Sequence, residues 1–308
     1  MTAHVQTQKR KLKQFGGIGD TILIGSIYLV LILILLIILL PIINIVASSF
    51  SAASAVSAGR VTFWPVDFSL EGYKAVFNNP LISGGFINSF YIMVVGTLVN
   101  LIVTMMAAYP LSFRYLEGKK LITLLFTFTM FFGGGMIPSY LVVRDLGMIN
   151  TIWSMVIPGA VSVYNIIIAR TFLQSSIPYE LYESAEIDGC SHARAFFTIT
   201  LPLSKALLAV LTLMFAVGHW NTYFNALMYL RDQDKFPLQL VLRQILVLNT
   251  FSIEQMTGGM AEEALERQYL GNLLKYSVIV VASAPMLAIY PFIQKHFVKG
   301  VMLGSLKG

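Results

Sequence analysis

The sequence is short of charge. Asp, Glu, Lys and Arg make up 12% of its 308 residues, about half of the roughly 25% that is usual in soluble domains. Hydrophobic residues make up 56%, and the mean hydropathy is +0.75. This composition excludes a soluble enzyme, a disordered chain and a coiled coil. At about 20 residues per crossing, the length accommodates about five to seven helices of a polytopic membrane protein.

Motifs for disulfides, metals and nucleotides are also missing. The single cysteine, Cys190, excludes an internal disulfide, and no Cys/His cluster has the spacing of a zinc site. No Gly-x-x-x-x-Gly-Lys-Ser/Thr phosphate cradle occurs, so no cofactor or metal is expected on this chain. Cys190 and His192 lack a third group to orient them as a catalytic pair. We therefore expect no enzymatic activity.

The sequence has a net charge of +6. In a membrane protein, this excess is expected from basic residues in cytoplasmic loops, which lie beside anionic lipid. It is therefore not taken as a sign of nucleic-acid binding. Thirteen of the 21 Lys and Arg residues lie in the N-terminus, 113–120, 170–205 and the C-terminal tail. This bias predicts that both termini are cytoplasmic.

Long runs without charge predict six membrane-spanning helices. They cover approximately 22–43, 87–111, 121–143, 152–170, 205–230 and 274–293. The third run is interrupted at Gly133–Gly135 and Pro138. The apolar core of the first run is about 22 residues long, against 7–15 in a signal peptide, so it is expected to stay as a true span.

These spans predict a division of the chain. It comprises a cytoplasmic N-terminus (1–20), a first transmembrane helix (21–47), an extracellular segment (48–83), a five-helix core (84–294) and a cytoplasmic tail (295–308). The core includes a cytoplasmic loop (175–203) and an extracellular segment (231–275).

The sequence of the loop 175–203 predicts two short helices. Ser175, Ser176 and Pro178 suit a helix start, and Gly189 suits a left-handed residue ending a helix over 179–188. A second helix, capped by Ser191, is expected over 193–198 and to stop at Thr200–Pro202. Three glutamates and an aspartate make the first helix acidic, whereas helices on anionic lipid favour Lys and Arg. Docking to a basic groove on a protein is therefore preferred over lying on lipid.

Glu183-Ser184-Ala185, Asp188-Gly189 and Ile199-Thr200-Leu201-Pro202 resemble the EAA loop of ABC importer permeases, with Ser184 and Cys190 where alanine is usual. Three further segments resemble maltose-type carbohydrate permeases: 68–73 (FSLEGY), Trp220-Asn221 and Lys307-Gly308. Residues 131–140 (FFGGGMIPSY) and 297–302 resemble the lipo-oligosaccharide or polygalacturonan subgroup. Asn88-Ser89 and Ala107–Tyr109 resemble the start of the importer core domain.

The resemblance implies a type I ABC importer permease fold in a bacterial cell membrane and import of a carbohydrate, with an oligosaccharide as the expected solute. It implies pairing with a second, homologous permease as a heterodimer, with two ATPase subunits that bind ATP and Mg, and with an extracellular solute-binding protein. It also assigns contacts to the ATPase. These are Glu180, Tyr182, Glu183, Ser184, Ala185, Glu186, Asp188, Gly189 and Pro202 in the loop, and Lys307 and Gly308 in the tail.

Polar residues in the spans are the candidates for contacts with the solute. They are Trp220, Asn221, Tyr223 and Asn225. Asn88 and Asn100 are instead expected to form hydrogen bonds between helices, and for Asn221 both interpretations stay open. The alternatives are the same machine for a non-sugar solute and a stand-alone secondary transporter. The latter is disfavoured because its class places ionisable residues inside the spans.

Overall fold

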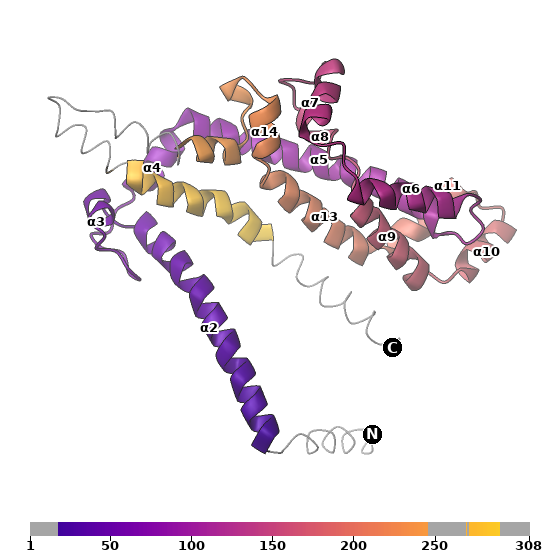
Figure 1. The fold of residues 1–308 in the computed structure, drawn as a ribbon, viewed down its shortest axis with the longest axis horizontal. Coiled ribbons are helices and arrows are strands. Elements are labelled where there is room, and N and C mark those ends of the chain that lie inside the picture. The colour runs from indigo at the N-terminus through magenta and orange to yellow at the C-terminus, as the bar shows by residue number, and fades with distance from the viewer. Residues whose placement is uncertain (1–17, 246–268, 270, 290–308) are drawn as a thin grey trace. The chain divides into compact units, whose positions relative to one another are not determined.

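The computed structural model describes residues 18–245, 269 and 271–289, and all regular structure in these ranges is helical. Contacts within the chain divide it into two units, 1–72 with 263–277 and 73–262 with 278–308. Each unit is described by itself (Figure 1).

Three helices in these ranges are long and apolar enough to cross a membrane: Gly19–Ser49, Pro80–Ser112 and Gly271–Ile289. Two pairs of shorter helices, each bent at a break, raise the number to five if each pair is one span. The all-α, polytopic class is thereby confirmed. The count of six helices and the cytoplasmic position of both termini stay predictions.

The first unit contains α2 (Ile18–Ser49), which includes the predicted span 21–47. The most apolar stretch of α2 has no buried side chain within the chain; Ile37, for example, is 70% exposed. Leu, Ile and Val side chains on every side of a helix suit a lipid environment. Their burial must come from outside this chain.

The segment after α2 folds onto the end of that helix. It contains the short helix α3 (Ala53–Ser57). The amide of Asn44 donates to the carbonyls of Val61 and Thr62, at 3.1 and 2.9 Å. The rings of Phe50 and Phe68 stack at 5.9 Å. These contacts order the first part of the predicted extracellular segment.

The second unit is built around α5 (Pro80–Ser112). Its first N–H groups are capped by Asn79, whose side chain accepts from Leu81 N–H, and Pro80 lies at the first helical position. α5 packs against α9 (Val163–Ser176) and α13 (Lys205–Trp220) (Figure 1). A buried cluster lies among these three helices and the residues that follow α5 and α9: Met105, Ala108, Tyr109, Leu111, Phe113, Ile166, Ala169, Leu173, Ile177, Leu207, Leu211 and Phe215. A further helix, α4 (Glu71–Asn78), precedes α5.

The third predicted span is broken where the sequence indicated. α6 (Lys119–Phe131) and α7 (Met136–Asp145) are separated by the three glycines and differ in direction by 111°. Gly135 has a φ of +84°, a backbone conformation that favours glycine.

The prediction of one continuous fourth helix over 152–170 is wrong. α8 (Trp153–Val156) ends early, residues 159–162 are not helical, and α9 runs on to Ser176. Pro158 and Gly159 explain the interruption, because proline lacks an N–H and glycine weakens a helix. The fifth helix, expected over 205–230, is likewise divided into α13 and α14 (Phe224–Tyr229). The short helix η2 (Gln233–Lys235) follows.

Asn100 of α5 bonds to the break between α8 and α9. Its side-chain N–H₂ donates to the carbonyls of Gly159 and Ala160, at 2.7 and 2.9 Å. Its side-chain oxygen lies 2.6 Å from Nε2 of His219 on α13, which requires the histidine tautomer with its proton on Nε2. The expected role of Asn100 in bonding between helices is confirmed.

α5 and α13 approach each other closely at Gly96. A Cβ added at Gly96 would lie 2.5 Å from atoms of the His219 ring. Gly96→Ala should therefore displace His219 and lower the free energy of unfolding by about 1–3 kcal/mol, as overpacking usually does. Thermal unfolding of the purified protein measures the change. Gly84→Ala on the same helix is the control, because nothing lies within 4 Å of its added Cβ; equal stability of the two variants would contradict the prediction.

Candidate functional site

The loop between α9 and α13 contains four helical pieces. They are α10 (Glu180–Ile187), α11 (His192–Ala195), the π-helix η1 (Phe196–Thr200) and α12 (Leu201–Leu203). The predicted first helix is confirmed, but the predicted serine cap is wrong. Ser175 and Ser176 belong to α9, and α10 has no side-chain cap. Because α9 is longer than expected, only a short connection is left before α10.

The end of α10 is a closed Schellman turn. Gly189 has a φ of +74°, as predicted. Its N–H donates to the carbonyl of Glu186 at 3.0 Å, and the N–H of Cys190 donates to that of Ala185 at 2.8 Å. These two bonds satisfy carbonyls that a helix end leaves unpaired. The side chain of Ser191 then accepts from Arg194 N–H, so α11 begins with the predicted cap.

The prediction that the second helix stops at Thr200–Pro202 is wrong. Leu201 keeps helical angles (φ −63°, ψ −46°), and the helix continues through Leu203 before the chain bends by 81° into α13. The reason is the π-helical stretch before Pro202. Its wider turn accommodates a residue that has no N–H to donate.

Aromatic rings hold α10 against the end of α5. The ring of Tyr182 lies 5.0 Å from that of Phe113 and 6.3 Å from that of Tyr109. The hydroxyl of Tyr182 is 2.9 Å from Oγ1 of Thr200, and the hydroxyl of Tyr109 donates to the carbonyl of His192 at 3.1 Å. Burial raises the pKa of Tyr182, and the bond to Thr200 opposes this in part. Tyr182, predicted to contact a partner, mainly joins the loop to its own chain.

The opposite face of α10 is open. Its four carboxylates are exposed: Glu180, Glu183, Glu186 and Asp188. Among the residues that the structure describes, none of the four takes part in an ion pair. Ile187 is 86% exposed, an unusual degree for an apolar side chain at a helix end. Ser184, Gly189 and Pro202 are also exposed, and Ala185 is half-buried.

A pocket of about 240 Å³ lies beside α10. Three tyrosines, a histidine and a glutamate give it an aromatic wall and an acidic edge; its lining is Tyr115, Tyr179, Tyr182, Ala185, Glu186, Cys190, Ser191, His192 and Ala195. The pKa of Tyr115 is raised by burial, and also by Tyr179 and Glu186. The surface around α10 can therefore receive a complementary, basic side chain.

The four residues predicted to contact the solute differ in their exposure and in their contacts within the chain. Trp220 is 1% exposed, its indole N–H donates to the carbonyl of Ala282 at 3.0 Å, and its ring meets Phe86 edge-on at 5.4 Å. It is a packing residue here, so its prediction as a sugar contact is not retained. The side chain of Asn221 is exposed, and its amide donates to the carbonyl of Val217 at 2.9 Å. Tyr223 is 44% exposed, and Asn225 is half-buried. The predicted tail contacts, Lys307 and Gly308, lie outside the described residues.

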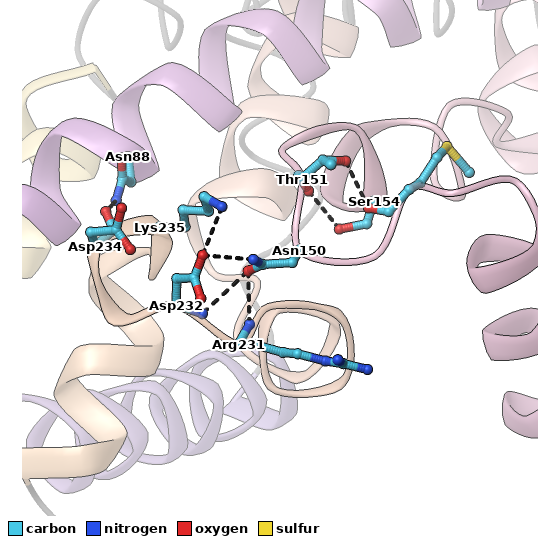
Figure 2. A network of polar contacts seen from close by, with 9 residues as sticks. Asn88, Asn150, Thr151, Ser154, Arg231, Asp232, Asp234 and Lys235 are labelled. Carbon is cyan, nitrogen blue, oxygen red and sulfur yellow. Dashed lines mark hydrogen bonds and ion pairs between the residues drawn. The ribbon is translucent and has the colours of Figure 1, made fainter.

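A polar clamp that the sequence did not suggest joins the start of segment 231–275 to the turn before α8 (Figure 2). The side-chain oxygen of Asn150 accepts from the N–H groups of Arg231 and Asp232. Its amide donates to the Asp232 carboxylate at 2.6 Å, as does Lys235 at 2.8 Å. The bonds from Lys235 and Asn150 lower the pKa of Asp232. The only signal in the sequence was an Asn in a turn, which tolerates the observed φ of +60°.

α5 provides a second anchor for the same segment. The Asn88 amide donates to the carbonyl of Asp234 at 2.7 Å (Figure 2). It also donates to the carbonyl of Phe236 at 3.1 Å. The hydroxyl of Ser89 accepts from Leu238 N–H at 2.8 Å. Asn88 was expected to bond between helices, and it joins α5 to the backbone of η2 and of the residue that follows η2.

Residues 93–303 match the model of a protein family described as binding-protein-dependent transport system inner membrane component. The chain belongs to this family. Its members are transport components, and the permease is a multi-pass membrane protein. It is 43% identical to Protein LplC of Bacillus subtilis over 86% of this chain and 88% of that protein.

Two further relatives extend the comparison. The permease is 42% identical to the polygalacturonan/rhamnogalacturonan transport system permease protein YtcP of Bacillus subtilis, over 92% of this chain and 97% of that protein. Its fold is similar to a chain in the crystal structure of a bacterial ABC transporter involved in the import of the acidic polysaccharide alginate. That match has a TM-score of 0.83 and 32% identity, and it covers 92% of this chain and 99% of the other.

The turn at Gly189 generates a prediction about stability. Gly189→Ala places a side chain in the left-handed region, which should cost about 1–2 kcal/mol and speed hydrogen exchange at the amides of 189–190. Nothing lies within 4 Å of the added Cβ, so the effect is conformational. Ser184→Ala on the same helix should not destabilise. A Gly189→Ala protein with unchanged exchange would show that the turn is not rigid.

The clamp of Asn150 generates a second prediction. Asn150→Ala removes the acceptor of two backbone N–H groups, so the amides of Arg231 and Asp232 should exchange at least about ten-fold faster. Because Asp232 has a lowered pKa, its carboxylate bonds persist at neutral pH and weaken only as the pH falls through that lowered pKa. Hydrogen-exchange mass spectrometry of the peptide over 229–236 gives the rates. Asn221→Ala is the control, and equal protection in both variants would contradict the assignment of the clamp.

Proposed function

We propose that this chain is the permease subunit of an ATP-driven importer that moves a carbohydrate, in oligosaccharide form, into a bacterial cell. The observation that carries the proposal is α10, a short acidic helix whose carboxylates form no ion pair with the described residues and whose Tyr182 packs on the end of α5. Such a helix can transmit a push from a partner without bending. The proposed partner is an ATPase pair that binds ATP and Mg, while this chain carries no cofactor of its own.

The proposed division of labour within the loop follows from exposure. Glu180, Glu183, Glu186 and Asp188 offer charge to a basic groove, and Ile187 offers an apolar contact at the tip. Ser184 and Ala185 allow close approach, whereas Gly189 and Pro202 set the turns on either side of α11 and η1. Tyr182 acts behind this surface, where it links α10 to α5. In the tail, Lys307 and Gly308 are proposed as additional ATPase contacts.

The choice of a carbohydrate rests on the relatives. YtcP is named for polygalacturonan and rhamnogalacturonan, and the structural relative is involved in the import of alginate. MelC of Bacillus subtilis, named for melibiose, raffinose and stachyose, is 30% identical over 80% of this chain. An acidic oligosaccharide is therefore the solute to test first. Asn221, Tyr223 and Asn225 are proposed to line its path.

Two further partners complete the proposed assembly. A second, homologous permease would form a heterodimer with this chain and enclose the path. An extracellular solute-binding protein would deliver the sugar. The clamped start of segment 231–275, held by Asn150, Asn88 and Ser89, offers that protein a fixed surface. Both termini of the permease are proposed to be cytoplasmic.

Ile187→Asp tests the coupling role. Because Ile187 is 86% exposed, the substitution disturbs almost no contact within the chain, but it adds charge to the proposed apolar contact. Uptake of a labelled oligogalacturonide by vesicles with the full complex should fall at least about ten-fold, the equivalent of about 1.4 kcal/mol of docking energy. The ATPase should no longer copurify.

The matched control is Leu146→Asp, which places the same charge at another exposed apolar position (64% exposed) after α7. Copurification of the ATPase should survive this change, and Ile187→Met should keep both copurification and uptake. Normal uptake by Ile187→Asp would argue against coupling through α10. Failure with galacturonides but stimulation of ATPase activity by another loaded receptor would instead change only the proposed solute.

A further inference from the structure

A second pocket, larger than the one beside α10, lies between the start of α6 and the middle of α9. It is an open pocket of about 510 Å³, lined by Lys119, Lys120, Thr123, Leu124, Thr127 and Arg170. Half of these side chains are cationic and none is acidic. The charged groups of the pocket therefore favour an anion over a cation.

The cations of this pocket are not neutralised by the part of the chain that the structure describes. The three ion pairs found there involve other residues. Lys119 donates to the carbonyl of Phe113 at 2.8 Å, which is a neutral acceptor. Arg170 and Arg114 bring further positive charge close to Lys119. Like charges held together in this way call for a counter-charge from outside.

Two polar atoms of the lining are buried without a hydrogen-bond partner among the described residues. They are Nε of Arg170 and Oγ1 of Thr123. Leaving such atoms unpaired costs roughly 1–3 kcal/mol each. An oxygen-rich group seated in the pocket would provide acceptors for the guanidinium and the hydroxyl at the same time.

Next to the cations, α6 contributes apolar side chains that are exposed. Leu124 is 65% exposed and belongs to a face of α6 that also exposes Leu121 and Phe128, at 61% and 55%. No described side chain of α6 is buried. A ligand that combines an anionic head with a hydrocarbon tail matches both parts of the site. A carboxylate on an acidic protein segment would match only the basic part.

We propose that this pocket binds an anionic phospholipid, with its phosphodiester among Lys119, Lys120 and Arg170 and an acyl chain along Leu124. Basic pockets beside membrane helices are suited to such headgroups. The proposal requires only that the protein lies in a membrane, and it does not depend on the solute or on the ATPase. Since Lys119 also bonds to Phe113, whose ring packs on Tyr182, a bound lipid would steady the base on which α10 rests.

Lipid binding to the purified, delipidated complex tests the proposal. Phosphatidylglycerol should bind at least about ten-fold more tightly than phosphatidylethanolamine. The double variant Lys120→Gln with Arg170→Gln should bind phosphatidylglycerol about thirty-fold more weakly, given the contribution expected of two charges near an anionic lipid. Native mass spectrometry of the titrated complex measures both ratios. Lys205→Gln is the control, because this exposed cation at the start of α13 does not line the pocket.

Each other outcome would overturn the proposal. Equal retention of the two lipids, or an unaffected double variant, would mean that the cations do not select a headgroup. Displacement of the lipid by millimolar inorganic phosphate would indicate a site for a free anion. Loss of a partner chain from the double variant, with lipid retention unchanged, would indicate a protein ligand. Arg170→Lys, which keeps the charge, should keep most of the binding, and thermal unfolding verifies that each variant is folded.

Discussion

The second unit depends on how backbone groups are satisfied where its helices break. In a bilayer, a carbonyl freed by a helix interruption has no water to accept from and must find a donor within the protein. The Asn100 amide supplies that donor for both Gly159 and Ala160, and its oxygen accepts a hydrogen bond from the Nε2–H of His219. One buried side chain thus connects α5, the α8–α9 break and α13. Its loss would leave two carbonyls at the break without this donor.

The loop with α10 uses a different solution, suited to a segment outside the membrane. There the backbone closes on itself through the Schellman turn at Gly189, and aromatic rings supply the attachment to α5. Few side chains of α10 pack against the rest of the chain, and these side chains lie on one face of the helix. The other face keeps its carboxylates and Ile187 available, which is the arrangement that a surface for a partner protein needs.

The class of fold and the position of the loop could be predicted from the sequence, because both depend on local signals. Charge-free runs mark apolar helices, and Gly189 can end a helix by its own conformational freedom. The breaks in the fourth and fifth helices were missed, since hydropathy does not register where backbone bonds end. Pro158 was a visible warning, whereas Pro202 pointed to a stop that the π-helical turn avoids. The clamp at Asn150 was not predictable, because its partners are about 80 residues away along the chain. The burial of Trp220 was not foreseen for the same reason, since it depends on contacts with distant residues.

The close approach at Gly96 has a mechanical consequence. With no side chain at this position, the His219 ring sits against the α5 backbone while its nitrogen is tied to Asn100 one turn further on. Sliding or rotation of α13 along α5 would break that bond and drive the imidazole into neighbouring side chains. The two helices, together with the break that Asn100 holds, must then travel as a single piece whenever the protein changes state.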